Sequence, residues 1–474
     1  MADDLNVYTG KLKYRGIDFT FVFNDEELRL IPPDNKVNEI QMEWLMKPIG
    51  EGLYIQGDPL YMEEPYLVGR CNETAKTMIF LTKQGGLIGH SNAVLFVRIF
   101  AYIICKYDRN AIDRMSFSSP EINCIHPINQ AFSYRADFKT FADDGIITIT
   151  TKDFDTTTTT AREFQVDDKV VHVLFGVARG VSTKIGEPPL SLNSSIMFEF
   201  EPTNDYAFIY RLWKIAKSFV QFLCYRKNIL LPVVELSAPC GDGKHEQFAI
   251  LYTLDVPVDT EPETLKKGRF IKQQYIAGSE GKILSDIASN KIYMQHLPET
   301  YDSGRHKDAA RFVMITAAFE WEFRRFYKDG VRKSEETINA EKTAMDAIET
   351  LWASSRGKLK KIYRFLMRRV KDNSLQSEII QVGKDFDDIV GVFGNQLYRM
   401  NDENLVYVEM GQRLGNQRNH FAHGDLDKDF IGLSLLDLVF LEFILYAIQL
   451  KYYGVDNKNI QRAINDLFQR NCVL

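Results

Sequence analysis

The side chains best suited to chemistry lie together in the segment GNQRNHFAHGD, residues 415–425. Six of the chain's eight His residues are scattered singly, but this segment holds two His beside an Arg and an Asn. Apolar residues before and within it predict a helix that ends at Gly424. We therefore expect a cluster of reactive groups at the end of a buried helix, made of Arg418, Asn419, His420 and His423.

Helical spacing brings three of these groups toward one another. Asn419 and His423 are four residues apart, so they share one face of the expected helix. Arg418 lies about 140° from His423 around the axis, and its long side chain can curl toward the imidazole at the helix end. The spacing therefore predicts a fixed cation, an amide and an imidazole near one another.

These groups suit cleavage of RNA by its own ribose 2′-hydroxyl. His423 can transfer protons because imidazole titrates near neutral pH. Arg418 stays ionised and offers a planar fork that matches the phosphate oxygens. Asn419 can orient the imidazole or bind a phosphate oxygen. Such a reaction requires no metal ion and no other cofactor.

Two other interpretations remain open for the same residues. Arg and His near the C-terminus of a helix commonly bond its last carbonyl groups and favour its dipole, which would make Arg418 and His423 structural. A helical domain of that kind would serve dimerisation or RNA binding. Alternatively, His420, His423 and Asp425 form an HxxHxD pattern that can hold the metal ion of a hydrolase, although no second cluster supplies further ligands.

The first half of the chain must supply a scaffold of strands. Apolar and polar residues alternate over residues 8–31, and similar short runs follow between Gly, Asp and Asn turns. Residues 92–106 are an exception, for which we predict a helix. The Thr-rich run at residues 156–160 predicts a strand edge or hairpin because β-branched residues favour extended backbone. We expect a sandwich or barrel-like β domain with helical insertions over residues 1–260.

Helical periodicity dominates from residue 261 to the end. Before that point, residues 205–227 predict one core helix capped by Asp205. After it, a stripe of Phe and Ile predicts a helix over residues 306–330, and Ser334 is a candidate cap for the next. Further helices are expected over residues 355–373, 405–424 and 430–454. The predicted fold class is therefore α+β, with a β-rich domain at residues 1–260 and an all-α bundle at residues 261–474.

The helix expected over residues 355–373 has an apolar face and a basic face. A basic stripe is most often a solvated surface, but in a chain of net charge −6 it is also the best candidate for an RNA phosphate track. Its cations are Lys361, Arg364, Arg368 and Lys371.

Composition limits the class of protein. The chain has 474 residues, 45% hydrophobic and 26% charged, as soluble globular proteins do. Its acidic balance excludes a surface coated everywhere by nucleic acid. The six Cys lie far apart with no CxxC pair, which is typical of reduced thiols. The N-terminus has no apolar signal core, and no run reaches the roughly 18 apolar residues of a membrane span, so we expect a cytoplasmic protein without membrane contact.

The pattern Arg418-Asn419-x-x-x-His423 resembles the RxxxxH motif of HEPN domains, in which a polar residue often follows the Arg. The helical surroundings, with the segment AAFEWEFRRFY at residues 317–327, also resemble the HEPN arrangement. A β-rich half followed by this bundle is similar to ApeA-type anti-phage HEPN proteins. The motif is six residues long, while the order of domains extends the resemblance over most of the chain.

This resemblance implies a metal-independent endoribonuclease of an anti-phage, abortive-infection system. Arg418 would stabilise the transition state and His423 would transfer protons. Glu320, on an earlier helix of the bundle, could support this site, but an exposed helix charge is the more common role of such a residue. HEPN ribonucleases usually set two copies of the motif face to face. Since this sequence contains one copy, the resemblance implies a homodimer or higher homo-oligomer formed through the C-terminal bundle. The N-terminal domain would hold the enzyme inactive until it senses a trigger, such as a phage-derived one.

Overall fold

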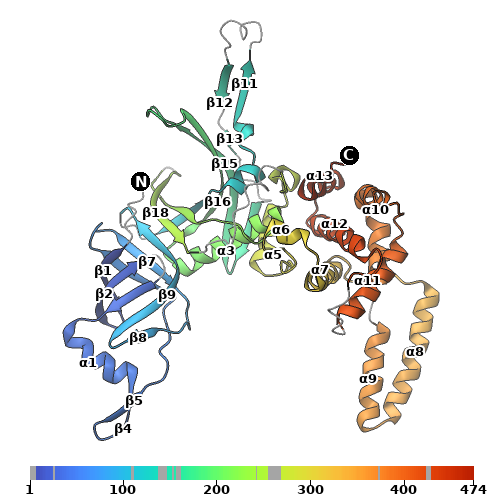
Figure 1. Ribbon diagram of the computed structural model, residues 1–474, viewed down its shortest axis with the longest axis horizontal. Helices are drawn as coiled ribbons and strands as arrows, with labels where there is room; N and C mark the ends of the chain where they lie inside the picture. The colour runs from blue at the N-terminus through green and yellow to red at the C-terminus, as the bar shows by residue number, and fades with distance from the viewer. Residues whose placement is uncertain are drawn as a thin grey trace. The chain divides into compact units, whose positions relative to one another are not determined.

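The computed structural model describes residues 7–24, 27–107, 111–136, 147–151, 154–155, 162–241, 243–254, 268–371, 374–422 and 429–473. They belong to two compact units, coloured from blue to red along the chain in Figure 1. The first comprises Met1–Lys266, Lys272–Gln274 and Gly278–Ser289, and the second comprises Lys267–Ile271, Tyr275–Ala277 and Asn290–Leu474. The first is rich in strands and the second is helical, which confirms the predicted α+β class.

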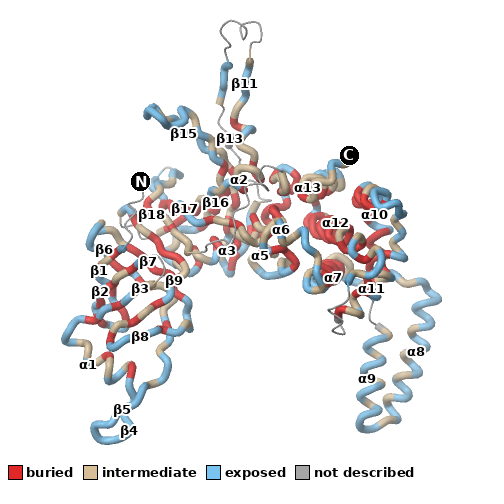
Figure 2. Tube along the Cα trace, in the orientation of Figure 1, coloured by how far each residue is buried: buried red, intermediate tan, exposed pale blue. Residues whose placement is uncertain are grey.

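Six antiparallel strands of the first unit close into a barrel. Their order is β9-β3-β2-β1-β6-β7, and β7 pairs again with β9 to complete the ring. Alternate side chains point inward, as the sequence predicts, and Figure 2 shows their buried positions in red. Phe21 and Phe23 of β2 both contact the ring of Phe80, at 5.1 and 5.3 Å between centroids. The bounds are β1 (Tyr8–Tyr14), β2 (Ile17–Asn24), β3 (Glu27–Ile31), β6 (Tyr66–Cys71), β7 (Thr77–Thr82) and β9 (Val94–Cys105).

Two glycines make room for one of these rings. A Cβ atom on Gly10 or Gly69 would lie 2.5 or 2.8 Å from the ring of Phe21. Real Cβ atoms do not approach carbon so closely, so either position must lack a side chain for β1 and β6 to pair over this ring.

The helix predicted over residues 92–106 is wrong, because this segment is strand β9. Leu95, Val97, Ile99 and each second residue as far as Cys105 are buried, which is the period of a strand. A long apolar run satisfies helical and strand templates alike. Pairing decided the outcome, since β9 bonds to β3, β7, β8 (Gly89–Ser91) and β18 (His245–Thr253).

The sheet continues beyond the barrel through β9. Its remaining order is β18-β17-β10-β16-β15-β13, with β14 on β15. The bounds are β10 (Ile112–Phe117), β13 (Phe154–Asp155), β14 (Glu163–Val166), β15 (Lys169–Val181), β16 (Leu190–Thr203) and β17 (Val233–Pro239). Two hairpins pair β4 (Met46–Gly50) with β5 (Leu53–Gln56) and β11 (Phe132–Ala136) with β12 (Ile147–Thr151). The Thr-rich run at residues 156–160 lies outside the described residues.

Helix α3 (Tyr206–Cys224) is the main helix of the first unit and confirms the helix predicted there. The Asp205 carboxylate accepts hydrogen bonds from the amides of Ala207 and Phe208, at 3.0 and 3.1 Å, and so caps it. The other α-helices among this unit's described residues are α1 (Val37–Glu39), α2 (Pro120–Ile125) and α5 (Glu280–Ala288).

The second unit is organised around α12 (Ser434–Tyr452). Residues 440–450 of this helix are buried all round, as expected of a central helix, and appear red in Figure 2. Four helices pack on it: α7 (Ala309–Phe326), α10 (Leu375–Arg399), α11 (Tyr407–Ala422) and α13 (Asn457–Phe468). The short α6 (Tyr301–Arg305) precedes α7. No helix in the described part of the chain is long and apolar enough to cross a membrane.

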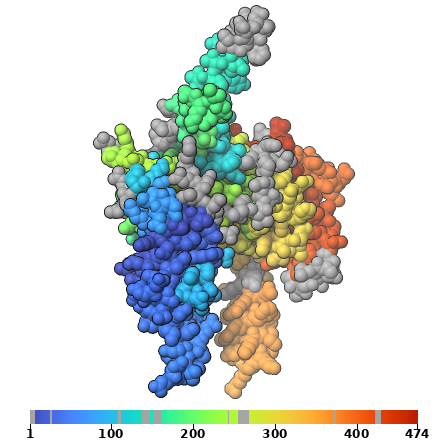
Figure 3. Space-filling view, turned by 60° about the vertical axis from the view of Figure 1, so that its left-hand side comes forward, coloured from blue at the N-terminus to red at the C-terminus, as the bar shows by residue number. Residues whose placement is uncertain are grey.

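Helices α8 (Glu335–Ser354) and α9 (Gly357–Lys371) form a hairpin that does not enter this core. The Ser334 hydroxyl accepts a bond from the Thr337 amide and caps α8, as predicted. The two helices pack on each other, and none of their described residues is buried. Figure 3 shows the hairpin, in light orange, standing clear of the other helices of its unit.

Candidate functional site

Helix α11 carries Arg418, and apolar packing sets which face it turns to the bundle. Met410, Leu414 and Phe421 are buried at helical spacing. The Phe421 ring lies 5.3 Å from Phe312 of α7 and 5.6 Å from Phe430. The end of α11 is therefore held against α7 and the chain that leads into α12.

Two polar contacts lock α11 to α12. Arg413 donates to both carboxylate oxygens of the buried Asp437, at 2.7 and 2.8 Å. The buried Gln417 accepts bonds from the Ile431 amide and the Ser434 hydroxyl, at 2.9 and 3.0 Å. Because buried polar groups are costly to leave unpaired, these bonds allow one register of α11 on α12.

That register points Arg418 at α7, where it forms a two-pronged ion pair with Glu320. Both terminal nitrogens of the guanidinium donate to the carboxylate, one to each oxygen, and the second bond measures 2.8 Å. The Glu320 side chain is 13% exposed and that of Arg418 is 40% exposed. Among the described residues Glu320 is the only bonded partner of Arg418, so three of its five N–H donors remain for another acceptor.

A second carboxyl group, that of Glu378, lies close enough for the charges of this pair to change its pKa. Glu378, near the start of α10, is buried, and its Oε2 has no hydrogen-bond partner in the described structure. Burial and the charge of Glu320 raise the pKa of Glu378 to about 8, although Arg324 and Arg418 oppose the shift. Glu378 is therefore protonated and uncharged at neutral pH.

We call Arg418, Glu320, Arg324 and Glu378 the Arg418 cluster. Two cations, one carboxylate and one neutral carboxyl group give it a net charge of +1 at neutral pH. Arg324 is exposed, and its Nε donates to the Glu320 carbonyl at 3.0 Å, which keeps its charge beside the pair. The cluster can attract an anion and offer it a fixed guanidinium.

The other predicted site residues fall differently. Asn419 is exposed and His420 is half-buried. His423 and Asp425 lie outside the described residues, as does the predicted helix end at Gly424. Of the HxxHxD pattern the structure therefore describes His420 alone. Within the described part of the chain, no three His, Cys, Asp or Glu side chains gather as metal ligands would.

The predicted basic stripe lies on the hairpin. Lys361, Arg364 and Arg368 are exposed on α9 and form no ion pair with any described residue. The side chain of Lys371, the last residue of α9, lies outside the described part. The stripe is thus an open cationic surface.

Sequence reasoning overlooked Glu378. The sequence does contain a sign of it, because Glu378 falls on the apolar stripe of its helix. The buried residues Leu375, Val382 and Phe386 lie three, four and eight residues from it. An acid on the buried stripe of a helix indicates a group whose charge the fold must neutralise.

Comparisons with known protein families, curated proteins and solved structures found no similar protein. No family model, no curated protein and no solved structure matches this chain. Its function must therefore be argued from the motif and the geometry of the site.

Proposed function

We propose that this chain is a metal-independent, HEPN-type endoribonuclease that acts in the cytoplasm in an anti-phage, abortive-infection system. The observation that carries the proposal is the Arg418–Glu320 ion pair. Two hydrogen bonds to Glu320 hold the Arg of the RxxxxH motif near the end of α11, a helix with one face buried in the bundle. A cation fixed in this way stabilises charge on a phosphate without rearranging during the reaction.

In the proposed reaction the ribose 2′-oxygen attacks the adjacent phosphorus. The new P–O bond forms as the bond to the 5′-oxygen breaks, which leaves a 2′,3′-cyclic phosphate and a 5′-hydroxyl. His423 removes the 2′-hydroxyl proton or gives a proton to the leaving oxygen. Arg418 stabilises charge on the equatorial oxygens, and the exposed Asn419 is available to bind one of them.

A second copy of the chain would supply the second His. Acid and base are both useful in this reaction, and each chain carries one RxxxxH motif. We propose that the α8–α9 hairpin helps to bind that copy. It exposes large apolar side chains that no other described element covers: Ile338, Leu351, Leu359, Ile362, Phe365 and Leu366.

Helical geometry places much of this apolar surface on one side of the hairpin. Trp352 of α8 and Tyr363 of α9 are half-buried, and Lys360 lies 4.4 Å over the Trp352 ring, so these residues mark the sides on which the helices meet. Leu351 precedes Trp352 and Ile362 precedes Tyr363, and each is therefore rotated by about 100° around its helix axis from that neighbour. Because α8 and α9 are antiparallel, both rotations point to the same side of the hairpin, so Leu351 and Ile362 share a face.

Charge favours a second hairpin as the occupant of this face. Helix α8 has five acidic residues and one Lys, whereas α9 has seven Lys and Arg and no acid. A two-fold axis along the hairpin would set the acidic helix of each copy over the basic helix of the other. The contact would bury on the order of 900 Å² in total, small for a stable dimer, so we expect it to supplement contacts within the bundle.

The proposed RNA track lies on the opposite side of α9. Arg364 follows Tyr363 by about 100° and therefore faces away from Ile362. The cations and the apolar stripe of α9 can thus serve RNA and a second copy at the same time.

Cleavage of RNA by purified protein tests the proposal. The wild type should cut single-stranded RNA in excess EDTA, leave 2′,3′-cyclic phosphate ends and spare DNA, which lacks the attacking hydroxyl. Arg418→Ala and His423→Ala should each lower the cleavage rate at least 100-fold, while His420→Ala, the matched control, changes it little. Wild-type rates in both variants with unchanged melting curves contradict the catalytic assignment. Loss of activity in EDTA that a divalent ion restores would favour a hydrolase using His420, His423 and Asp425.

A non-catalytic role is the second candidate, favoured by the same ion pair. Glu320 already satisfies two Arg418 donors, as a structural Arg would require. In that case the bundle dimerises or binds RNA through α9 without cutting it. Intact RNA bound by wild-type protein, and lost on reversing the charge of Lys361 and Arg364, would identify this role.

A further inference from the structure

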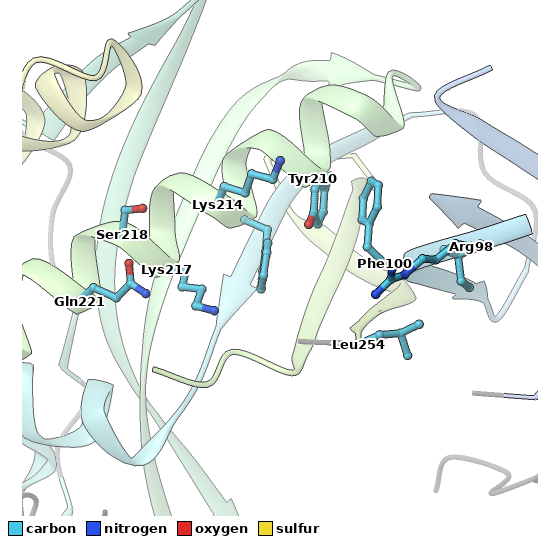
Figure 4. Close-up of a pocket in the computed structure, with 10 residues that line it drawn as sticks. Arg98, Phe100, Tyr210, Lys214, Lys217, Ser218, Gln221 and Leu254 are labelled. Atoms are coloured by element: carbon cyan, nitrogen blue, oxygen red, sulfur yellow. The ribbon is translucent and has the colours of Figure 1, made fainter. Parts of the chain in front are cut away.

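The first unit contains a hollow of about 610 Å³, within the range of small-molecule sites (Figure 4). One wall is a face of α3, where Tyr210, Trp213, Lys214 and Lys217 recur at spacings of three and four residues. Another is the middle of β9, from Arg98 to Phe100. The described lining of the hollow comes entirely from this unit and includes no residue of the Arg418 cluster.

The described lining of the hollow is cationic. Arg98, Lys214 and Lys217 all reach it, and none of the lining residues that the structure describes is Asp or Glu. Arg98 and Lys214 are exposed and form no ion pair with any described residue. Three positive charges converging on one concave surface indicate an anionic ligand.

Aromatic rings lie beside these cations. The Tyr210 ring stacks on Trp213, with centroids 5.2 Å apart and planes 15° from parallel, and Phe100 lies 4.2 Å from Tyr210. Lys214 lies over the Tyr210 ring at 4.5 Å. Figure 4 shows Phe100 and Arg98 extending from their strand toward the α3 residues. Phe100 and Tyr210 are each partly exposed, and Phe100 and Lys214 already lie against the Tyr210 ring, so a flat group can pack on the part of this aromatic wall that stays exposed.

The aromatic wall of the hollow is held in place and is uncharged at neutral pH. Trp213 is buried, and its Nε1 donates to the Leu231 carbonyl at 2.9 Å. Burial raises the pKa of Tyr210 to about 12, so its phenol stays neutral, and lowers the pKa of Lys217 from its ordinary value. The stacking surface is therefore uncharged and fixed in place.

A second hollow, of about 430 Å³, shares Arg98, Ile99 and Phe100 with the first and adds Lys83. Its described lining residues likewise include no Asp or Glu. The two hollows flank the same segment of β9, so a ligand longer than the first hollow meets a further cation.

We infer that this surface is a nucleotide-binding site, with a base packed against the aromatic wall that Phe100 and Tyr210 form and phosphates bound by Arg98, Lys214 and Lys217. Both halves of a nucleotide have a matching surface here, whereas a simple anion leaves the aromatic wall unused. The nucleotide is either free or part of a single strand. This inference concerns the first unit and stands whether or not the chain cleaves RNA.

Titration of the full-length protein with ADP tests the site. Binding is followed by calorimetry and by the fluorescence of Trp213, one of four Trp in the chain. ADP should bind with a micromolar dissociation constant, and adenosine or inorganic phosphate alone at least tenfold more weakly. Trp213→Phe should remove the fluorescence change while calorimetry still detects ADP.

Matched variants locate the binding. Lys214→Glu and Phe100→Ala should each weaken ADP binding at least tenfold, since they remove a phosphate contact and a stacking ring. Arg211→Glu changes the charge of α3 outside the hollow and should leave binding unchanged. Melting curves establish that each variant is folded, and Lys214→Arg should restore binding if Lys214→Glu acts through charge.

A short single-stranded DNA, which lacks a 2′-hydroxyl, distinguishes a site for free nucleotides from a site for nucleotides within a strand. If it competes with ADP and binds more tightly, the site takes nucleotides within a strand; if it does not compete, the ligand is a free nucleotide. Absence of ADP and oligonucleotide binding at millimolar concentration overturns the inference. So does equal binding of ADP and inorganic phosphate, which would identify a plain anion site.

Discussion

At the scale of single residues, the central feature is an Arg that is both held and available. Glu320 takes two donors of Arg418 and fixes the plane of its guanidinium, while the side chain stays 40% exposed. Glu320 thus orients Arg418 in the proposed reaction.

Glu320→Gln tests this orienting role. The Gln amide has nearly the same shape as the Glu carboxylate but lacks the negative charge that holds the Arg418 guanidinium in place. We therefore expect a 10- to 100-fold lower RNA cleavage rate. Since the pair is partly exposed, its loss should cost only about 1 kcal/mol of unfolding free energy. Glu320→Asp, which keeps the charge on a shorter arm, is the matched control and should retain more activity. Full activity in Glu320→Gln would show that Arg418 needs no such support.

Glu378 makes the unfolding free energy depend on pH. Its pKa is about 8 in the folded protein against an ordinary 4.5, so between these values the folded state holds a proton that the unfolded state releases. The stabilisation is complete below about pH 4.5 and is lost as the pH rises to about 8, by at most about 5 kcal/mol. Glu378→Gln cannot titrate, so it should be the more stable protein at pH 9, by about 2 kcal/mol or more. Denaturant unfolding from pH 5 to 9 measures the difference, and parallel curves for both proteins would contradict it.

The sequence reveals these residues unequally. Arg418 stands out through its motif, whereas Glu320 resembles an exposed helix charge until the structure shows it 13% exposed and paired with Arg418. Arg324 lies four residues after Glu320 on α7, so local helical geometry is enough to bring these two together. Glu378 joins them only through the packing of α10 against α7, because side chains distant along the chain meet by tertiary contact that local periodicity does not encode.

At the scale of elements, the periodicity of apolar residues predicted the structure well where it matched either a helix or a strand but not both. The stripe on α7 and the caps of α3 and α8 are confirmed, since each depends on neighbours within one helix. β9 was mistaken for a helix because its apolar run fits both periods, and its strand partners come from distant parts of the chain. The amphipathic pattern of α9 correctly indicated a helix, but it did not show that the apolar face would remain exposed.

The hairpin face gives a prediction at this scale. Ile362→Glu places a charge on the proposed contact between copies and should weaken dimerisation at least tenfold in sedimentation experiments. Specific activity should then fall at micromolar concentration. Lys361→Glu, one position away and outside the apolar stripe, should weaken RNA binding and leave dimerisation nearly intact. Unchanged association in Ile362→Glu would exclude the hairpin as a contact between copies.

At the scale of the whole molecule, the chain joins a barrel-containing unit to a helical one. We propose that the first unit restrains the second until a trigger binds. Moving a two-state protein from about 1% to 99% active requires roughly 5.5 kcal/mol of differential affinity. A ligand with equal affinity for both states cannot do this, however tightly it binds.

Expression of residues 261–474 alone tests the restraint. The fragment should be more toxic to uninfected cells than the full chain, and toxicity should disappear with His423→Ala. Its boundary needs care, because α5 belongs to the first unit and its buried Glu280 lies 3.3 Å from Arg162 there. A second fragment beginning at residue 290 serves as the control for that exposed helix. If both fragments fold and dimerise yet are no more toxic than the full chain, the first unit has another role.

The bond from the Ile431 amide to Gln417 has a consequence for how this protein can evolve. It joins the chain on either side of the segment that includes His423, so α11 and α12 are registered without help from that segment. Insertions there should change the free energy of closing the chain between Gln417 and Ile431 only slightly, about 0.6 kcal/mol for a doubling of its length. Selection can therefore vary the surroundings of His423, and in the proposed ribonuclease the RNA sequences that it accepts, while the helices that carry Arg418 and Glu320 stay in place.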